Sequence, residues 1–446
     1  MNEGNAAVKK PLFRLTWPIY IELLFFMLMG VADTLMLSQY SDLSVAAVGN
    51  ANRIMGVFIV VMNAVALGVG VIVSQLVGAK REAEAKVVMR AGLFGSVMIS
   101  ILLTTFISLF AAQVFILIRT DASIFSESLW YLRTVVIGIP FIAGTQAISA
   151  GFKSFGKTKL VMVIIGMTNM LNVVLNAFLI FGIGFFPELG VAGAGYATLF
   201  SKIVTFVVAL YFFKRLFVKT ILSGGIKALF DYFPRILRIG IPGATEHFFY
   251  QMMQVILLSF INTLGALALT TQIYVHNLMM PVLVFSLALA QGNQVMVGWF
   301  IGGNTIQDAY HRTLKTMRIA IIIVLLIVSI MAWQAPMLIG VFTDNPDIIK
   351  MASRIMLVVI ILELGRTSNL IIIQALRAAG DVIYPVVIAV FSMFGVAITL
   401  AYVLGLRLEY GLFGIFIALA ADECVRGLLV FIRWLRKDWI KKTVIE

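Results

Sequence analysis

Charged residues, cysteine and histidine are all scarce in this sequence. Asp, Glu, Lys and Arg make up 12% of its 446 residues, 61% are apolar, and the mean hydropathy is +1.03. Soluble domains do not have this balance, so the composition predicts a protein that crosses the membrane many times. The single cysteine, Cys424, excludes a disulfide within the chain, and the spacings of His247, His276 and His311 suggest no metal site.

Catalytic motifs are also missing. The sequence contains no HExxH, no GxSxG and no paired-aspartate motif, so an intramembrane enzyme is disfavoured and no cofactor is expected. The net charge of +13 would suggest a nucleic-acid partner in a soluble protein. Here the basic residues lie mainly in short loops between apolar runs, where they set membrane orientation, so we expect no nucleic-acid partner.

Twelve apolar segments are long enough to cross a bilayer as helices. The first six are 12–38, 43–77, 86–118, 125–152, 158–181 and 190–217. The second six are 233–262, 267–301, 309–342, 347–379, 383–404 and 412–435. The first run is too long for a signal peptide, so we expect it to remain as a span. The sequence therefore predicts an all-α polytopic membrane protein with 12 transmembrane helices.

The basic residues predict the orientation of these helices. If the N-terminus is cytoplasmic, 25 of the 34 Lys and Arg residues fall in inner segments, six lie at or near the outer side and three lie in mid-span. Because positive charge accumulates on the cytoplasmic side, both termini are expected in the cytoplasm. The longest connection contains Ser223, Gly224 and Gly225 and is interpreted as a linker at 217–232 between lobes at 1–216 and 233–446.

The two halves repeat one another at an offset of 224 residues. Three residues near the start of the first span recur in the second half, with Arg14, Pro18 and Glu22 matching Arg238, Pro242 and Glu246. Six spans per half is an even number, so both halves have the same topology. The repeat predicts two pseudo-symmetric six-helix bundles related as parallel repeats, with a cavity between them.

The first predicted helix carries two acidic residues, Glu22 and Asp33. Eleven positions at about 100° per residue place them on one face, roughly 16 Å apart along an ideal helix axis. Asp33 has Leu257 as its counterpart at the 224-residue offset, so this acid belongs to the first half alone. Ionisable residues within a span are expensive and are usually functional or paired, which makes both side chains candidates for lining a cavity.

The fifth predicted helix carries three amides on one stripe, Asn169, Asn172 and Asn176. Carboxylate, amide and hydroxyl oxygens together suit a desolvated proton or a sodium ion. The pattern favours an ion site at Asp33, Asn172 and Asn176, with hydrogen bonding between helices as the alternative. For Asn169 that structural interpretation is preferred.

In the second half, Glu363, Arg366 and Asn369 share a helical stripe, and Glu423 precedes Arg426 by three residues. Both acid and arginine combinations have the i, i+3 spacing that favours a pair on one helix, so these are interpreted as structural ion pairs.

Glu246 has no basic residue three or four positions away, which makes it the stronger candidate for a carboxylate that faces a cation.

Taken together, the motifs resemble those of the multidrug and toxic compound extrusion (MATE) transporters. They are the opening WP…E…VADTLMLS, the loop QLVGAKREAEA, the NxxxN of the fifth span, PELGVAGAGYAT, and ExxRxxN…QALRAAGD. The order of these motifs and the duplication cover the whole chain. The resemblance is greatest to the DinF-like branch or a related bacterial branch.

This resemblance implies a cation-coupling site for H⁺ or Na⁺. Asp33 matches the first-helix aspartate of the family, Asn172 the first polar member of the fifth-helix pair, and Thr198 the sixth-helix hydroxyl. Asn176 takes the second position of the pair, where sodium-binding relatives often have aspartate. With one negative charge fewer, H⁺ is favoured over Na⁺ as the coupling ion.

A second group of residues is implied around the substrate. Tyr131 fits a fourth-helix aromatic, and Glu246 matches the seventh-helix glutamate of another branch. Arg366 stands where that branch has its tenth-helix aspartate, which argues against a sodium site in the second lobe. The full predicted group is Glu22, Tyr131, Glu246, Glu363, Arg366 and Asn369.

The resemblance also implies the activity: secondary active export of organic cations and amphipathic drugs across the cell membrane, by alternating access and antiport. We expect a monomer in the lipid bilayer. The alternative is a lipid-linked precursor flippase of the same superfamily, which predicts mid-membrane arginines that face the centre. A channel is disfavoured because isolated carboxyls suit an occluding site better than a continuous pore.

Overall fold

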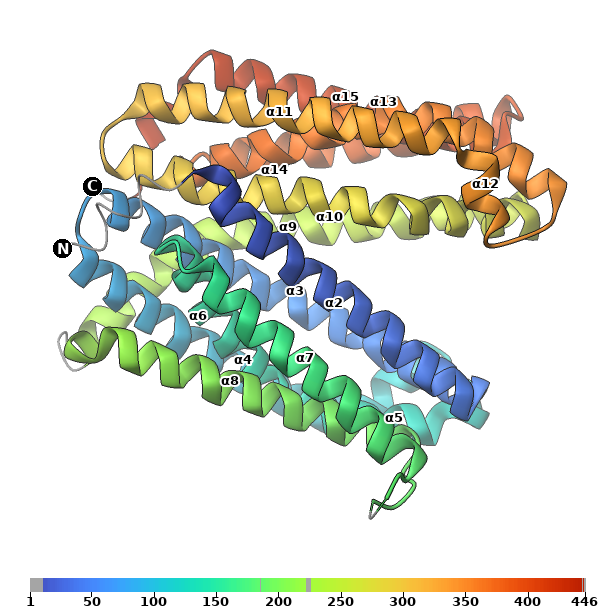
Figure 1. The fold of residues 1–446 in the computed structure, drawn as a ribbon, viewed down its shortest axis with the longest axis horizontal. Coiled ribbons are helices and arrows are strands. Elements are labelled where there is room, and N and C mark those ends of the chain that lie inside the picture. The colour runs from blue at the N-terminus through green and yellow to red at the C-terminus, as the bar shows by residue number, and fades with distance from the viewer. Residues whose placement is uncertain (1–10, 185, 222–225, 443, 445–446) are drawn as a thin grey trace. The chain divides into compact units, whose positions relative to one another are not determined.

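The computed structural model describes residues 11–184, 186–221, 226–442 and 444, and nearly all of these residues are helical (Figure 1). The helices of the first half are α2 (Leu12–Tyr40), α3 (Asp42–Gly78), α4 (Glu82–Leu117), α5 (Ala122–Val136), α6 (Ile139–Ser154), α7 (Thr158–Phe181) and α8 (Val191–Ile221). Those that follow are α9 (Ile226–Thr263), α10 (Ala266–Gly302), α11 (Ile306–Trp333), α12 (Ala335–Gly340), α13 (Pro346–Ala378), α14 (Ile383–Ser392), η1 (Met393–Ile398), η2 (Ala401–Arg407), α15 (Gly411–Leu435) and η3 (Asp438–Lys442).

Each of the twelve predicted spans corresponds to one helix or to a run of helices. Length and hydropathy identify eight helices that are apolar enough to cross a membrane among the described residues, or nine if α5 and α6, bent by 45°, form one span. The helices α9, α13 and α15 fall outside that set. The eleventh span consists of α14 followed by the π-helices η1 and η2.

The chain forms two compact units, Met1–Ile241 and Pro242–Glu446. The division falls inside α9, so the first unit includes the start of that helix. Much of the predicted linker at 217–232 is helical, since α8 ends at Ile221 and α9 begins at Ile226. Residues 222–225 lie outside the described part. A local break in helical geometry occurs at Phe217, where the predicted sixth span ends.

Local sequence sets several helix ends. Asn345 caps α13 by accepting hydrogen bonds from the backbone N–H groups of Asp347 and Ile348, and Pro346 follows at the first helical position. Asp121 caps α5 in the same way, accepting from the Ser123 N–H over 2.8 Å. Gly182 ends α7 in the left-handed conformation, with φ of 66°. These ends are fixed by backbone chemistry independently of the long-range packing.

Packing positions the polar residues of each unit. In the first unit α2 packs against α7, while α8 packs against α5 and α7. In the second unit α13 packs against α10, α11 and α15, so it is the central helix of that bundle (Figure 1). The core of the second unit is aliphatic along this helix, where Ile355, Met356 and Val359 are fully buried. The polar stripe of α13 is therefore presented to neighbouring helices within the same bundle.

Two glycines allow α13 and α15 to approach closely. A Cβ atom at Gly365 would lie 2.6 Å from the backbone nitrogen of Cys424 and 2.7 Å from the carbonyl carbon of Glu423. At Gly427 it would lie 3.1 Å from the Gly365 carbonyl oxygen. Small residues at helix interfaces in membranes allow backbones to approach in this way. The contact brings the charged residues of the two helices together.

We predict that Gly365→Ala destabilises the protein by about 1–3 kcal/mol, because the added methyl group would overpack the α13–α15 contact. Gly56→Ala is the matched control, since a Cβ atom there meets no atom within 4 Å. That substitution should be neutral or slightly stabilising, because alanine favours helix more than glycine does. Thermal unfolding in detergent measures both; equal melting temperatures for the two variants would contradict the close contact.

Candidate functional site

Asp33 and the asparagines of α7 meet in the first unit. The Asn176 amide nitrogen donates a hydrogen bond to Asp33 Oδ1 over 2.6 Å, and the same nitrogen lies 3.5 Å from Asn172 Oδ1. Both asparagines are buried, while Asp33 is half-buried. The Asn176 Oδ1 atom is buried without a hydrogen-bond partner in the described structure. The three residues therefore form one polar cluster, called the Asp33 cluster below.

Tyr131 and Thr198 lie beside this cluster. The Tyr131 side chain, on α5, lies close to those of Thr198 on α8 and Asn52 on α3, and it interacts electrostatically with Asp33. Tyr131 and Thr198, which the family resemblance implied, therefore lie in the same part of the lobe as Asp33. Asn52 was not expected from the sequence. A short polar side chain in a long apolar helix gave little signal by itself.

Asn169 and Glu22 do not join the Asp33 cluster. Asn169 is buried on the same helix, but its Nδ2 atom has no hydrogen-bond partner among the described residues, so the interhelical bond expected for it is not seen. Glu22 is paired elsewhere, with Lys153 of α6. Glu22 and Asp33, although predicted on one face of the helix, therefore have different partners and belong to different clusters.

Lys202 is the main residue that the sequence analysis missed. It lies one turn after Thr198 on α8, and its ammonium group is close enough to interact electrostatically with Asp33. Lys202 is one of the three basic residues that the charge pattern places in mid-span. The available signal was a lysine within an apolar span, four residues after the expected hydroxyl position, because an intramembrane charge requires a partner. The first lobe thus contains a basic residue within electrostatic range of its carboxylate.

Each unit also contains an ion pair at an equivalent position of the repeat. Lys153 Nζ lies 2.8 Å from Glu22 Oε1, and Arg377 Nη2 lies 2.6 Å from Glu246 Oε2. Both partners are shifted by the same 224 residues between the halves. Glu246, for which the local sequence offers no basic partner, therefore has one in Arg377. The local sequence could not reveal Arg377, because in each unit the partner lies 131 residues further along the chain.

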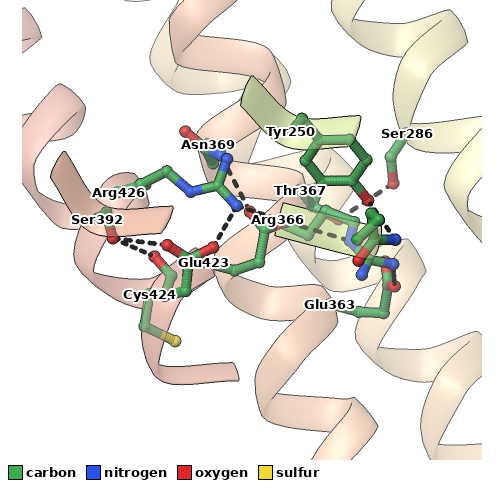
Figure 2. A network of polar contacts seen from close by, with 12 residues as sticks. Tyr250, Ser286, Glu363, Arg366, Thr367, Asn369, Ser392, Glu423, Cys424 and Arg426 are labelled. Carbon is green, nitrogen blue, oxygen red and sulfur yellow. Dashed lines mark hydrogen bonds and ion pairs between the residues drawn. The ribbon is translucent and has the colours of Figure 1, made fainter. Parts of the chain in front are cut away.

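The charged residues of α13 and α15 form a larger network in the second unit (Figure 2). Arg366 contacts Glu363 at 2.5 Å on its own helix and Glu423 at 3.5 Å on α15. Arg426 contacts Glu423 at 3.1 Å. The two ion pairs predicted at i, i+3 spacing are thus confirmed. The link between them across the helix–helix contact could be seen only in the tertiary structure.

Neutral side chains complete this network. Asn369 donates a hydrogen bond to Glu423 Oε2 over 3.0 Å. Asp422, fully buried, contacts Arg426 at 2.5 Å and accepts a hydrogen bond of 2.7 Å from the Ser392 hydroxyl. Buried ions need such partners, because desolvation otherwise outweighs their attraction. We call Glu363, Arg366, Asp422, Glu423 and Arg426 the second-lobe network.

A cavity of about 270 Å³ lies beside this network, within the second unit. Its charged wall is formed by Arg366, Glu423 and Arg426. Tyr250, Gln254, Gln272 and His276 add polar groups, and most of the remaining lining is apolar, including Met253, Met279 and Met280. Of the residues predicted to surround a substrate, Arg366 lines this cavity. The other three of the second half contact neighbouring side chains instead. Glu363 pairs with Arg366, Asn369 donates a hydrogen bond to Glu423, and Glu246 pairs with Arg377.

The architecture is that of a polytopic helical transporter built from two duplicated six-helix bundles. The MatE family model matches residues 18–178 and 242–403, one match in each half. An uncharacterized transporter, YisQ of Bacillus subtilis, is 40% identical over 447 residues, covering 98% of both chains. A probable multidrug resistance protein, NorM of Thermotoga maritima, is 26% identical over 442 residues, covering 98% of this chain and 94% of the relative.

Solved structures share the fold. A structure described as MATE in the bent conformation superimposes with a TM-score of 0.88 at 21% identity, covering all of this chain and 98% of the other. An outward-facing multidrug resistance MATE transporter of the MOP superfamily gives 0.85 at 21% identity, with 99% and 98% coverage. The chain therefore belongs to the MATE family, a family of transporters rather than enzymes.

We predict that Lys153→Met costs about 3–5 kcal/mol of stability, because it leaves Glu22 buried without its cation. The double variant Glu22→Gln/Lys153→Met should recover most of that loss, since neither charge then remains. The repeat supplies an internal comparison, so Arg377→Met and Glu246→Gln/Arg377→Met should behave in the same way. Thermal unfolding in detergent measures all four variants; a double variant as unstable as its single parent would exclude pairing as the cause.

Proposed function

We propose that this protein is a secondary active multidrug efflux transporter of the cell membrane, with both termini in the cytoplasm. It exports organic cations and amphipathic compounds by alternating access, in exchange for H⁺. The observation that carries the proposal is the Asp33 cluster, a half-buried carboxylate bonded to Asn176 within an apolar lobe. Names of relatives agree with export, since the related NorM of Thermotoga maritima is described as a probable multidrug resistance protein.

The polar contacts of Asp33 favour a proton over sodium as the coupling ion. Sodium requires several oxygen ligands, but Asn176 presents its amide nitrogen to Asp33 instead of an oxygen. Lys202 adds a positive charge close to the carboxylate, which repels a metal ion. A proton can bind Asp33 without further ligands. Protonation would also neutralise Asp33 and remove its electrostatic attraction to Lys202. Loss of that attraction allows the bound proton to change the conformation of the first lobe.

The transport cycle follows from this exchange. Protonation of Asp33 from outside releases the substrate, and deprotonation towards the cytoplasm restores the charged site that accepts the next one. One inward-moving proton gains about 2.3 kcal/mol per 100 mV of membrane potential, against about 1.4 kcal/mol for each tenfold substrate gradient. If the substrate is itself a monovalent cation, one-for-one exchange cancels the voltage contribution. The concentration gradient of H⁺ then drives export alone.

A lipid-linked precursor flippase is the second candidate. It predicts arginines that face a cavity, and Arg366 and Arg426 line the cavity of the second unit. Both guanidinium groups, however, contact acidic side chains of the second-lobe network. A large anionic headgroup would have to compete with those acids, so this assignment is ranked below drug export.

We predict that Asp33→Asn lowers H⁺-driven transport at least tenfold, because an amide cannot carry the coupling proton. The measurement is uptake of a lipophilic fluorescent cation into liposomes containing the purified protein, under imposed H⁺ and Na⁺ gradients in turn. Asp121→Asn is the matched control, since Asp121 is exposed and asparagine caps a helix equally well. No uptake by the wild type under either gradient would exclude drug export and direct attention to lipid flipping.

We also predict that Lys202→Met makes transport responsive to Na⁺, because it removes the cation that competes with a metal ion near Asp33. In the wild type, a Na⁺ gradient without a H⁺ gradient should drive little uptake. Lys214→Met is the control, since it removes an exposed lysine from the same helix. If the Lys202 variant remained indifferent to Na⁺ while still transporting with H⁺, Lys202 would not be the group that excludes sodium.

A further inference from the structure

The second-lobe network has no part in the proposed proton cycle, although it is a costly group of buried charges. Glu363 and Asp422 are fully buried, with 0% of each side chain exposed. Arg366 is 17% exposed and lines the cavity, together with Glu423 and Arg426. The cavity wall therefore presents two guanidinium groups and one carboxylate, while the other two acids lie behind it.

The guanidinium groups have donors beyond their ion pairs. A guanidinium carries five N–H groups, and the contacts of Arg366 to Glu363 and Glu423 engage Nη1 and Nε. The contacts of Arg426 to Asp422 and Glu423 both engage Nη2, so its Nη1 group takes part in neither ion pair. Arginine forks match the two oxygens of a carboxylate. The polar end of the cavity is thus suited to a carboxylate group on a ligand.

The rest of the cavity suits an apolar body. Met253, Met279 and Met280 line it together with Leu257 and Leu283. Methionine side chains are flexible and polarizable, so such a wall adapts to differently shaped apolar groups. Pockets for drug-sized molecules have volumes of about 300–1,000 Å³, so a cavity of about 270 Å³, just below that range, fits a small ligand.

Charge balance adds a condition. The network has three carboxylates and two guanidinium groups, so a bound carboxylate would bring a fourth acid to the same two cations. Additional negative charge is costly in a buried site, but one proton shared among the acids returns the site to the single excess negative charge of the empty network. The groups around that proton would be Glu363 and Arg366 on α13, and Asp422, Glu423 and Arg426 on α15. Tyr250 on α9 and His276 on α10 complete the titratable groups of the cavity wall.

From the cavity wall and this charge count, we propose that the second-lobe cavity binds an amphipathic organic carboxylate together with one proton. The carboxylate lies against Arg366 and Arg426, and the apolar body lies among the methionines. This site differs from the Asp33 cluster in lobe, charge and ligand class, so it extends the proposed function without depending on it. An organic cation is the competing occupant, because it would neutralise the excess negative charge of the network. It would, however, be repelled by the two guanidinium groups of the cavity wall.

The test uses two fluorescent ligands of equal shape, 1-naphthaleneacetate and its neutral amide, 1-naphthaleneacetamide. Binding to the purified full-length protein in detergent is measured by calorimetric titration at several pH values between about 6 and 8, where the ligand carboxylate stays ionised. We expect the carboxylate to bind at least tenfold more tightly than the amide. Its affinity should rise up to about tenfold for each unit by which the pH falls, because one proton binds with it.

Two variants separate charge from shape. Glu363→Gln removes one negative charge from behind the cavity wall, so the carboxylate should bind more tightly than to the wild type and lose its pH dependence. Arg426→Gln should weaken carboxylate binding at least tenfold and leave the amide unchanged. Arg354→Gln is the control, since it removes an exposed arginine from the same helix as Arg366 and should change neither affinity.

Three results would overturn the proposal. The first is equal affinity of the wild type for the carboxylate and the amide. The second is tighter binding of 1-naphthylmethylammonium than of the carboxylate, which would assign the cavity to organic cations. The third is carboxylate binding that keeps its pH dependence in Glu363→Gln. Because these are binding measurements, they remain decisive even if drug transport through the Asp33 cluster fails.

Discussion

Every charge buried in this apolar protein requires a partner, and this constraint organises both lobes. Water is absent from the membrane interior, so an isolated carboxylate or ammonium group there is costly. Glu22 and Glu246 meet Lys153 and Arg377, and the acids of α13 and α15 meet Arg366 and Arg426. The arrangement of the helices is therefore also an arrangement of charge pairs.

The duplication preserves this pairing in one place and changes it in another. The Glu22–Lys153 and Glu246–Arg377 contacts are equivalent, which indicates a structural requirement common to both halves. The Asp33 cluster has no such counterpart, because Leu257 stands where Asp33 would recur. The second lobe instead concentrates its charge on α13 and α15. Two lobes of one fold thus offer different chemistry: a single carboxylate with amides in the first, and a compact ionic network in the second.

Helix packing brings polar residues from different helices together. The proximity of α2 and α7 joins Asp33 to Asn176, and the glycines of α13 and α15 allow the second-lobe network to form. Unpartnered atoms remain in both places, at Asn176 Oδ1 and at Arg426 Nε. Buried polar groups are seldom left unpaired, so each of these atoms retains the capacity for one further hydrogen bond. A transporter needs such incomplete sites, because it must bind its cargo and release it again.

Sequence alone determined the twelve helical segments, the duplication and the pairs within one helix, because hydrophobic length and i, i+3 spacing are local properties. It also marked Asp33, Asn172 and Asn176, since polar residues are conspicuous in apolar runs. Only the tertiary structure decided that Glu246 is paired, that Lys202 lies near Asp33 and that two ion pairs merge beside a cavity. Those contacts join residues far apart in the chain, and their existence depends on which helix faces pack together.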